Sequence, residues 1–171
     1  MNFEIKATDD LTFGKPFIES IQDLFHTMFM EEIRVDSIVS GTDPVTTRAV
    51  TAVIGLSGAV RGTVAIYFPD YIACHLAGRL LGMELNTIDE TVSDAVAEIV
   101  NIVAGGAKGR IASDQIRQVD LGLPTVVVGT DYTVQYPAGS RRATVALSGN
   151  FGEFSMAITY KELIGEGSYG K

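Results

Sequence analysis

Residues 94–109 read DAVAEIVNIVAGGAKG, and this stretch decides the fold because its spacing is that of a long amphipathic helix. With a turn of about 100° per residue, Asp94, Glu98, Asn101 and Gly105 fall on one narrow side of the helix, here called the polar stripe. The opposite side is apolar and holds Val92, Val96, Ile99, Val103 and Gly106. Such a helix is expected to pack its apolar side against a sheet or another helix.

The residues around this stretch predict the limits of the helix and a use for its glycines. Thr87-Ile-Asp-Glu90 has the form of a capping box, which places the helix start near Ile88, and the pattern continues to about Ser113. Each glycine costs a helix about 1 kcal/mol relative to alanine. Gly106 is expected to allow close packing, whereas Gly105 leaves room on the polar stripe for an approaching molecule.

The rest of the chain predicts two further helices and a set of strands. The helices are expected from Pro16 to about Glu32 and over residues 70–83. Alternating and β-branched residues predict two hairpins and one extended run broken at Gly129. These strands are expected at residues 48–58, 60–69, 125–136, 142–149 and 154–161.

A short similarity links the two hairpins. Leu-Ser-Gly occurs at the turn of each, at residues 56–58 and 147–149, and each hairpin follows a helix that carries a spaced acid and amide. These pairs are Glu19 with Gln22, and Glu98 with Asn101. We therefore expect an α+β fold, a largely antiparallel sheet with long helices on one face, built from a helix-plus-hairpin unit used twice. A single domain is expected over residues 1–171, with a flexible tail from about residue 164 to residue 171.

Composition argues against several functions. The net charge of −8 is unlike that of a nucleic-acid-binding protein, and the only adjacent basic pair, Arg141-Arg142, is expected at a solvated hairpin tip. The start of the chain has no secretory signal, and no stretch is long and apolar enough to insert in a membrane, so a cytoplasmic location is expected. The single cysteine, Cys74, excludes internal disulfides. His26 and His75 have no motif around them, so no metal site is expected.

The polar stripe offers a narrow range of chemistry. The chain has no G-x-S-x-G elbow, no Walker loop and no paired Cys and His. The amide of Asn101 cannot act as a general base, but it can hold a water by donating to it and accepting from it. Glu98 could pair with a lysine of a docking protein. Such a residue set suits a labile bond or an active site that a partner supplies; the plain alternative is a solvated helix face.

These residues resemble the CheX branch of the CheC/CheX/FliY phosphatases. The family pattern is Asp or Ser, three residues, Glu, two residues, Asn on a long helix, and here it reads Asp94-Ala-Val-Ala-Glu98-Ile-Val-Asn101. Flanking stretches are similar too: AVIGLSGAVRGTVAIYF, LLGMELNTIDETVSDAVAEIVNIVAG and LPTVVVGTDYTVQY. The resemblance covers most of the chain.

The resemblance implies a function and a set of partners. It implies hydrolysis of the aspartyl phosphate of a CheY-like chemotaxis receiver domain, with Asn101 orienting the attacking water and Glu98 contacting the receiver's lysine. Asp94 and Gly105 would belong to the docking surface. This chain would bind no cofactor, because Mg²⁺ belongs to the receiver. A homodimer is also implied, and the valine-rich segment 125–130 would suit its contact.

The first helix carries a degenerate copy of the motif. It reads Lys15-Pro-Phe-Ile-Glu19-Ser-Ile-Gln22, with Gln in place of Asn and Lys in place of Asp or Ser. We interpret Glu19 and Gln22 as the relic of a second site left by duplication.

Two other hypotheses remain open from the sequence. One is a non-catalytic adaptor or motor-associated module of the same fold that binds receivers or a deamidase. The other is an unrelated fold in which the polar stripe is only a solvated face. Burial of Glu98 and Asn101 would support this last hypothesis.

Overall fold

The computed structural model describes residues 9–41, 43, 45, 47–114 and 118–163, which form a seven-stranded sheet and three α-helices. The elements follow in the order α1 (Asp9–Leu24), a π-helical turn η1 (Phe25–Phe29), β1 (Arg34–Ser40), β2 (Val50–Gly58), β3 (Val60–Phe68), α2 (Asp70–Leu81), α3 (Glu90–Asp114), β4 (Val119–Leu121), β5 (Thr125–Val128), β6 (Arg141–Gly149) and β7 (Gly152–Glu162).

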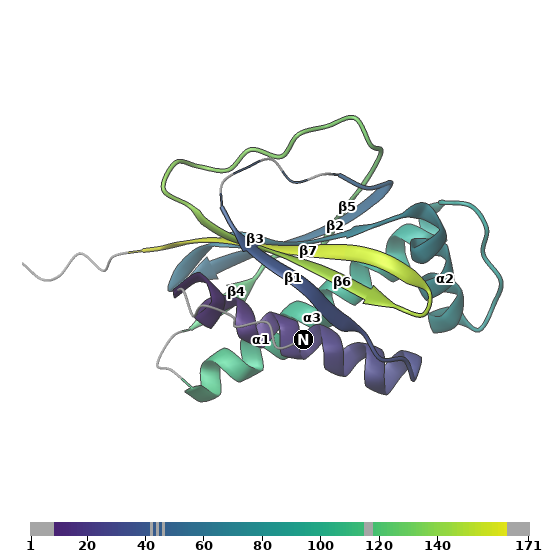
Figure 1. Ribbon diagram of the computed structural model, residues 1–171, viewed down its shortest axis with the longest axis horizontal. Coiled ribbons are helices and arrows are strands. Elements are labelled where there is room, and N and C mark those ends of the chain that lie inside the picture. The colour runs from purple at the N-terminus through teal and green to yellow at the C-terminus, as the bar shows by residue number, and fades with distance from the viewer. Residues whose placement is uncertain (1–8, 42, 44, 46, 115–117, 164–171) are drawn as a thin grey trace, which may run out of the picture.

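All strand pairs are antiparallel, and the strand order is β1-β6-β7-β3-β2-β4, with β5 also pairing with β2. Figure 1 shows α1 and α3 side by side on one face of the sheet, and loops crossing the other face. The sheet and its helices confirm the predicted α+β class. The predicted tail lies outside the described residues.

The strand order shows how two similar units interlock. β1, which follows α1, pairs with β6 of the second hairpin, while β4 and β5, which follow α3, pair with β2 of the first hairpin. The hairpins themselves meet through β3 and β7 at the centre of the sheet. Each unit therefore completes the sheet of the other. This topology agrees with a helix-plus-hairpin unit used twice.

The apolar side of α3 lies in the core, as the spacing predicted. Val92, Val96, Ile99 and Val103 are fully buried. They belong to one cluster that also contains alternate residues of β2, among them Val50, Ala52 and Ile54. Because strand side chains alternate between faces, the residues between them lie on the face away from the helices. The orientation of α3 is thus fixed by its apolar residues, and the polar stripe points outward.

The first helix begins earlier than predicted, because α1 starts at Asp9 and contains Pro16 in its interior. An interior proline removes one helix hydrogen bond, which is why the sequence predicts a helix start at Pro16. In the structure, tertiary packing of the preceding turn outweighs that loss. Phe13, one turn before it, packs on Tyr160 at 4.2 Å between ring centroids. The helical region ends in the π turn η1, before the predicted limit at Glu32.

Three predicted details of the second half are wrong. Asp89 rather than Thr87 caps α3, because its Oδ1 accepts a hydrogen bond of 3.0 Å from the amide of Val92. The predicted break at Gly129 is confirmed by its φ of 147°, but the strand predicted to continue to residue 136 does not resume after it, because β5 ends at Val128 and the chain leaves the sheet. Arg142 lies within β6 and is only 6% exposed, so it is not at a solvated tip.

Candidate functional site

The polar stripe lies on the surface of α3. Asp94, Glu98 and Gly105 are exposed and Asn101 is half-buried, whereas the residues behind them are in the core. This is the arrangement that the helical spacing predicted. Burial of Glu98 and Asn101, which would have supported an unrelated fold, is not observed.

The side chains of the polar stripe have no partners among the residues that the structure describes. Within the part of the chain that the structure describes, neither Glu98 nor Asn101 makes a side-chain hydrogen bond or an ion pair. A Cβ added at Gly105 or at Gly109, one turn later, would meet no atom within 4 Å. Gly109 was not predicted as part of this surface, although its spacing of four from Gly105 could have revealed it. The result is a flat surface with two polar groups one turn apart.

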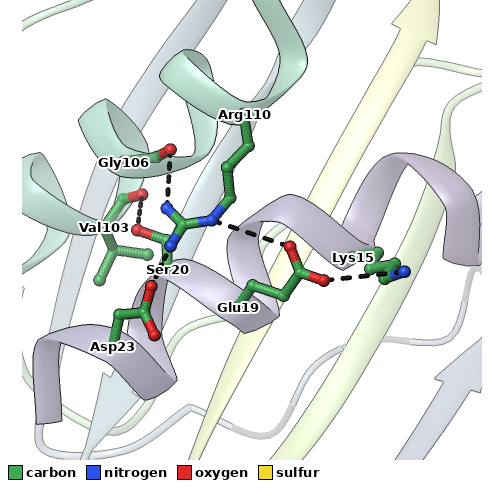
Figure 2. Close-up of polar contacts among 7 residues, drawn as sticks. All are labelled: Lys15, Glu19, Ser20, Asp23, Val103, Gly106 and Arg110. Carbon is green, nitrogen blue, oxygen red and sulfur yellow. Dashed lines mark hydrogen bonds and ion pairs between the residues drawn. The ribbon is translucent and has the colours of Figure 1, made fainter. Parts of the chain in front are cut away.

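The corresponding residues of α1 are held within the chain. Glu19 lies 3.7 Å from Lys15 Nζ and 3.7 Å from Arg110 Nε. Arg110, which comes from α3, also pairs with Asp23 of α1 (Figure 2). A glutamate that already faces two cations is less available to a lysine of another protein than one that faces none. Gln22 is half-buried.

Close packing of the two helices explains Gly106. The buried Ser20 Oγ of α1 donates a hydrogen bond of 2.7 Å to the carbonyl of Val103 in α3. A Cβ at Gly106 would overlap that same Ser20 Oγ. The Arg110 guanidinium donates to the Gly106 carbonyl at 3.0 Å, beside the same contact (Figure 2). Adjacent glycines therefore serve opposite sides: Gly106 admits α1, and Gly105 keeps the polar stripe low.

Comparison with known protein families decides the classification. The family described as chemotaxis phosphatase CheX matches residues 50–148, which is more than half of the chain and includes the whole polar stripe. This chain belongs to the CheX family. The match begins after α1, so the pair Glu19 and Gln22 lies outside it.

Individual relatives agree with CheX membership. The CheY-P phosphatase CheX of Thermotoga maritima is 30% identical over 88 residues, which are 51% of this chain and 56% of that protein. The aligned part thus spans little more than half of that relative.

Solved structures of the CheX family share the fold. A CheX structure from Vibrio vulnificus has a TM-score of 0.79 and 28% identity, and the match covers 88% of this chain and 99% of that one. A CheX-CheY-BeF3-Mg²⁺ complex from Borrelia burgdorferi has a TM-score of 0.72 and 20% identity, covering 88% of this chain and 98% of that one.

Cys74 and His75 lie in a separate region, on α2. Burial raises the pKa of the Cys74 thiol, and the nearby Asp70 and Asp89 raise it further, which keeps the thiol protonated. The His75 ring stacks on Phe151, with 5.9 Å between centroids. Cys74 and His75 line a cavity of about 740 Å³ that contains no residue of the polar stripe. They are not placed to assist Glu98 and Asn101.

Among the described residues, no three His, Cys, Asp or Glu side chains gather as a metal site would need. No helix in the same residues has both the length and the hydropathy to cross a membrane.

Proposed function

We propose that this chain hydrolyses the aspartyl phosphate of a CheY-like receiver domain, using the polar stripe of α3. The observation that carries the proposal is the surface pair of exposed Glu98 and half-buried Asn101, one turn apart and without partners among the described residues, beside the open positions Gly105 and Gly109. A flat surface of this kind suits another protein's surface better than a small-molecule pocket.

In the proposed reaction, the amide of Asn101 positions a water opposite the phosphorus–oxygen bond of the acyl phosphate. The water oxygen bonds to phosphorus as the bond to the aspartyl oxygen breaks, giving a carboxylate and inorganic phosphate, and the water's proton passes to phosphate or solvent. Asn101 donates and accepts hydrogen bonds without changing charge. Glu98 pairs with a lysine of the receiver and fixes the geometry. Asp94 and Gly105 contribute to the docking surface.

Two findings support this proposal. The CheX family is described as chemotaxis phosphatases, and the Thermotoga maritima relative is a CheY-P phosphatase. The Borrelia burgdorferi protein, which has the same fold, is found in a complex with CheY, BeF3 and Mg²⁺. We propose that Mg²⁺ is bound by the receiver, and that this chain supplies the water-orienting amide.

The decisive experiment follows the decay of a radiolabelled phospho-receiver with Mg²⁺ and catalytic amounts of this protein. Wild-type protein should accelerate the decay, and Asn101→Ala should lower that rate by roughly 10²–10³-fold, the cost of losing one positioning group. Glu98→Ala should mainly raise the protein concentration needed for half-maximal rate. An unchanged rate for Asn101→Ala would refute the role of that residue.

The same assay separates an enzyme from an adaptor. An adaptor would bind the phospho-receiver, as measured by fluorescence anisotropy, but would leave its half-life unchanged. Binding without acceleration, tested against each receiver available, would overturn the phosphatase proposal.

We also propose that the protein is a homodimer that uses β5. This strand pairs with β2, and Val127 and Val128 are 39% and 58% exposed. An edge strand with exposed valines is suited to pairing with a second copy. Light scattering coupled to gel filtration should give the mass of a dimer, and Val128→Lys should shift it to a monomer. A monomeric wild-type protein would contradict this.

A further inference from the structure

A second polar cluster lies on the face of the sheet away from α1 and α3. The register places Thr63 of β3 opposite Thr159 of β7, and Thr159 opposite Arg142 of β6. Their strand neighbours Val64 and Ile158 belong to the core beneath the helices. Because strand side chains alternate, the three polar residues form a row on the other face. Figure 1 shows loops crossing this face.

Arg142 is the central feature of this cluster. The residue is only 6% exposed, and its guanidinium carbon lies 5.4 Å from the centre of the Tyr136 ring. A guanidinium carries five N–H donors, and contact with a ring face satisfies none of them. Among the residues that the structure describes, no carboxylate or carbonyl pairs with this side chain. Its nitrogens are not among the fully buried polar atoms that lack a partner, so they are open to an acceptor that enters from the cavity.

Two buried hydroxyl groups near Arg142 also lack partners. Thr159 Oγ1 and Thr63 Oγ1 are buried and make no hydrogen bond among the described residues. The nearby Tyr67 differs, because its hydroxyl interacts with Tyr136 through a side-chain hydrogen bond, and burial raises its pKa far above the ordinary value. The Arg142 guanidinium and the two threonine hydroxyls therefore remain without acceptors among the described residues.

A cavity opens onto this cluster. It has a volume of about 350 Å³ and is lined by Arg142, Thr159, Tyr136 and other residues of the 133–140 loop. Asp43 lines an adjoining cavity of about 300 Å³ together with Arg142 and Arg48, but it makes no ion pair with Arg142. The charge beside the first cavity is therefore positive, and its size suits a small molecule.

We propose that this cavity binds a small oxyanion, a phosphate or carboxylate group, which accepts from the Arg142 guanidinium and the Thr159 hydroxyl. Tyr136 stacks on the guanidinium and holds it in place. A single buried cation with neutral hydroxyl donors matches the charge and geometry of one such group. The site is separate from the polar stripe, because it lies on the opposite face of the sheet. It does not depend on the phosphatase proposal.

Calorimetric titration of the purified protein with inorganic phosphate and, separately, with acetate at constant ionic strength tests the proposal. We expect saturable binding of one or both anions. Arg142→Gln should weaken it by about tenfold or more, the usual effect of losing a charge-assisted hydrogen bond. Arg141→Gln is the matched control, since it removes the same charge from the exposed neighbouring residue, and should bind as wild type does.

Saturation by phosphate alone would identify a phosphoryl group as the ligand, and saturation by acetate alone a carboxylate. No saturation by either anion, or equal affinity of wild type and Arg142→Gln, would overturn the proposal, leaving the cluster as one hydrated by water.

A conservative variant guards against misfolding of Arg142→Gln. Thr159→Val removes a hydroxyl that lines the cavity and has no partner among the described residues, so it should not lower the unfolding temperature of the free protein. It should weaken anion binding several-fold and reduce the stabilisation that the anion produces. Unchanged affinity of Thr159→Val would also overturn the proposal.

Discussion

The two long helices carry the same spacing of acid and amide but differ in what surrounds it. On α3, Glu98 and Asn101 face outward and have no partner among the described residues. On α1, Glu19 is flanked by Lys15 and by Arg110, a residue of α3 itself. A motif can serve another protein only when its own chain leaves it free. The difference predicts that the α3 motif is the working surface, and that the α1 motif is blocked by the ion pairs that Glu19 makes within the chain.

The sharpest test of this comparison is a matched pair of alanine variants. Asn101→Ala should reduce the phosphatase rate by roughly 10²–10³-fold, because it removes the amide that orients water. Gln22→Ala, at the same place in the α1 motif, should leave the rate unchanged within about twofold, since its helix is expected to take no part. Initial rates of receiver dephosphorylation measure both. Equal losses would show that both helices are active.

Sequence alone predicts the α3 half of this comparison well. Apolar residues every three or four positions orient the helix, and that orientation places Glu98 and Asn101 outside. The α1 half could not be predicted, because Arg110 lies 91 positions after Glu19 in the chain and meets it only through tertiary packing. Residue spacing predicts which side chains are neighbours on one helix, but it does not predict which charged side chains of another helix will pack beside them.

Reopening the α1 surface should recover part of the activity. In the Asn101→Ala background, Gln22→Asn alone should stay inactive, because Glu19 remains paired. Adding Lys15→Gln and Arg110→Gln together, which frees Glu19 from both cations, should raise the rate about tenfold over the background, a fraction of what one positioning group supplies. The same dephosphorylation assay applies. Recovery by Gln22→Asn alone would show that Arg110 does not close this surface.

Neighbouring glycines of α3 should respond to alanine in opposite directions. Gly106→Ala should lower the free energy of unfolding by about 1–3 kcal/mol, because the new Cβ would overlap Ser20 Oγ. Gly105→Ala meets open space and should raise that free energy by up to about 1 kcal/mol through helix propensity. Urea unfolding followed by circular dichroism measures both. Equal changes would mean that α1 and α3 do not pack closely at Gly106.

Features of the far side of the sheet show where sequence patterns fail. β1 is mostly exposed and carries a register shift between Val35 and Ser37, so it lacks the alternation that marks a strand. Arg142 looked like a surface residue because arginines usually are, yet the loop with Tyr136 covers it. Both depend on contacts between segments distant in the chain. The sequence predicts best those regions in which the burial of each side chain depends on residues of the same helix or hairpin.

The smallest effect is expected from Arg110→Gln in the otherwise wild-type protein. The side chains of its pairs with Glu19 and Asp23 are 31% to 67% exposed, and exposed ion pairs contribute at most about 1 kcal/mol because water screens them. The free energy of unfolding should therefore fall by less than about 1 kcal/mol, and the difference should shrink in high salt. Lys108→Gln, which breaks an exposed pair between Lys108 of α3 and Asp120 of β4, is the control. A clearly larger loss that persists in high salt would mean that Arg110 is a structural clamp between α1 and α3, and that its role in closing the α1 motif is secondary.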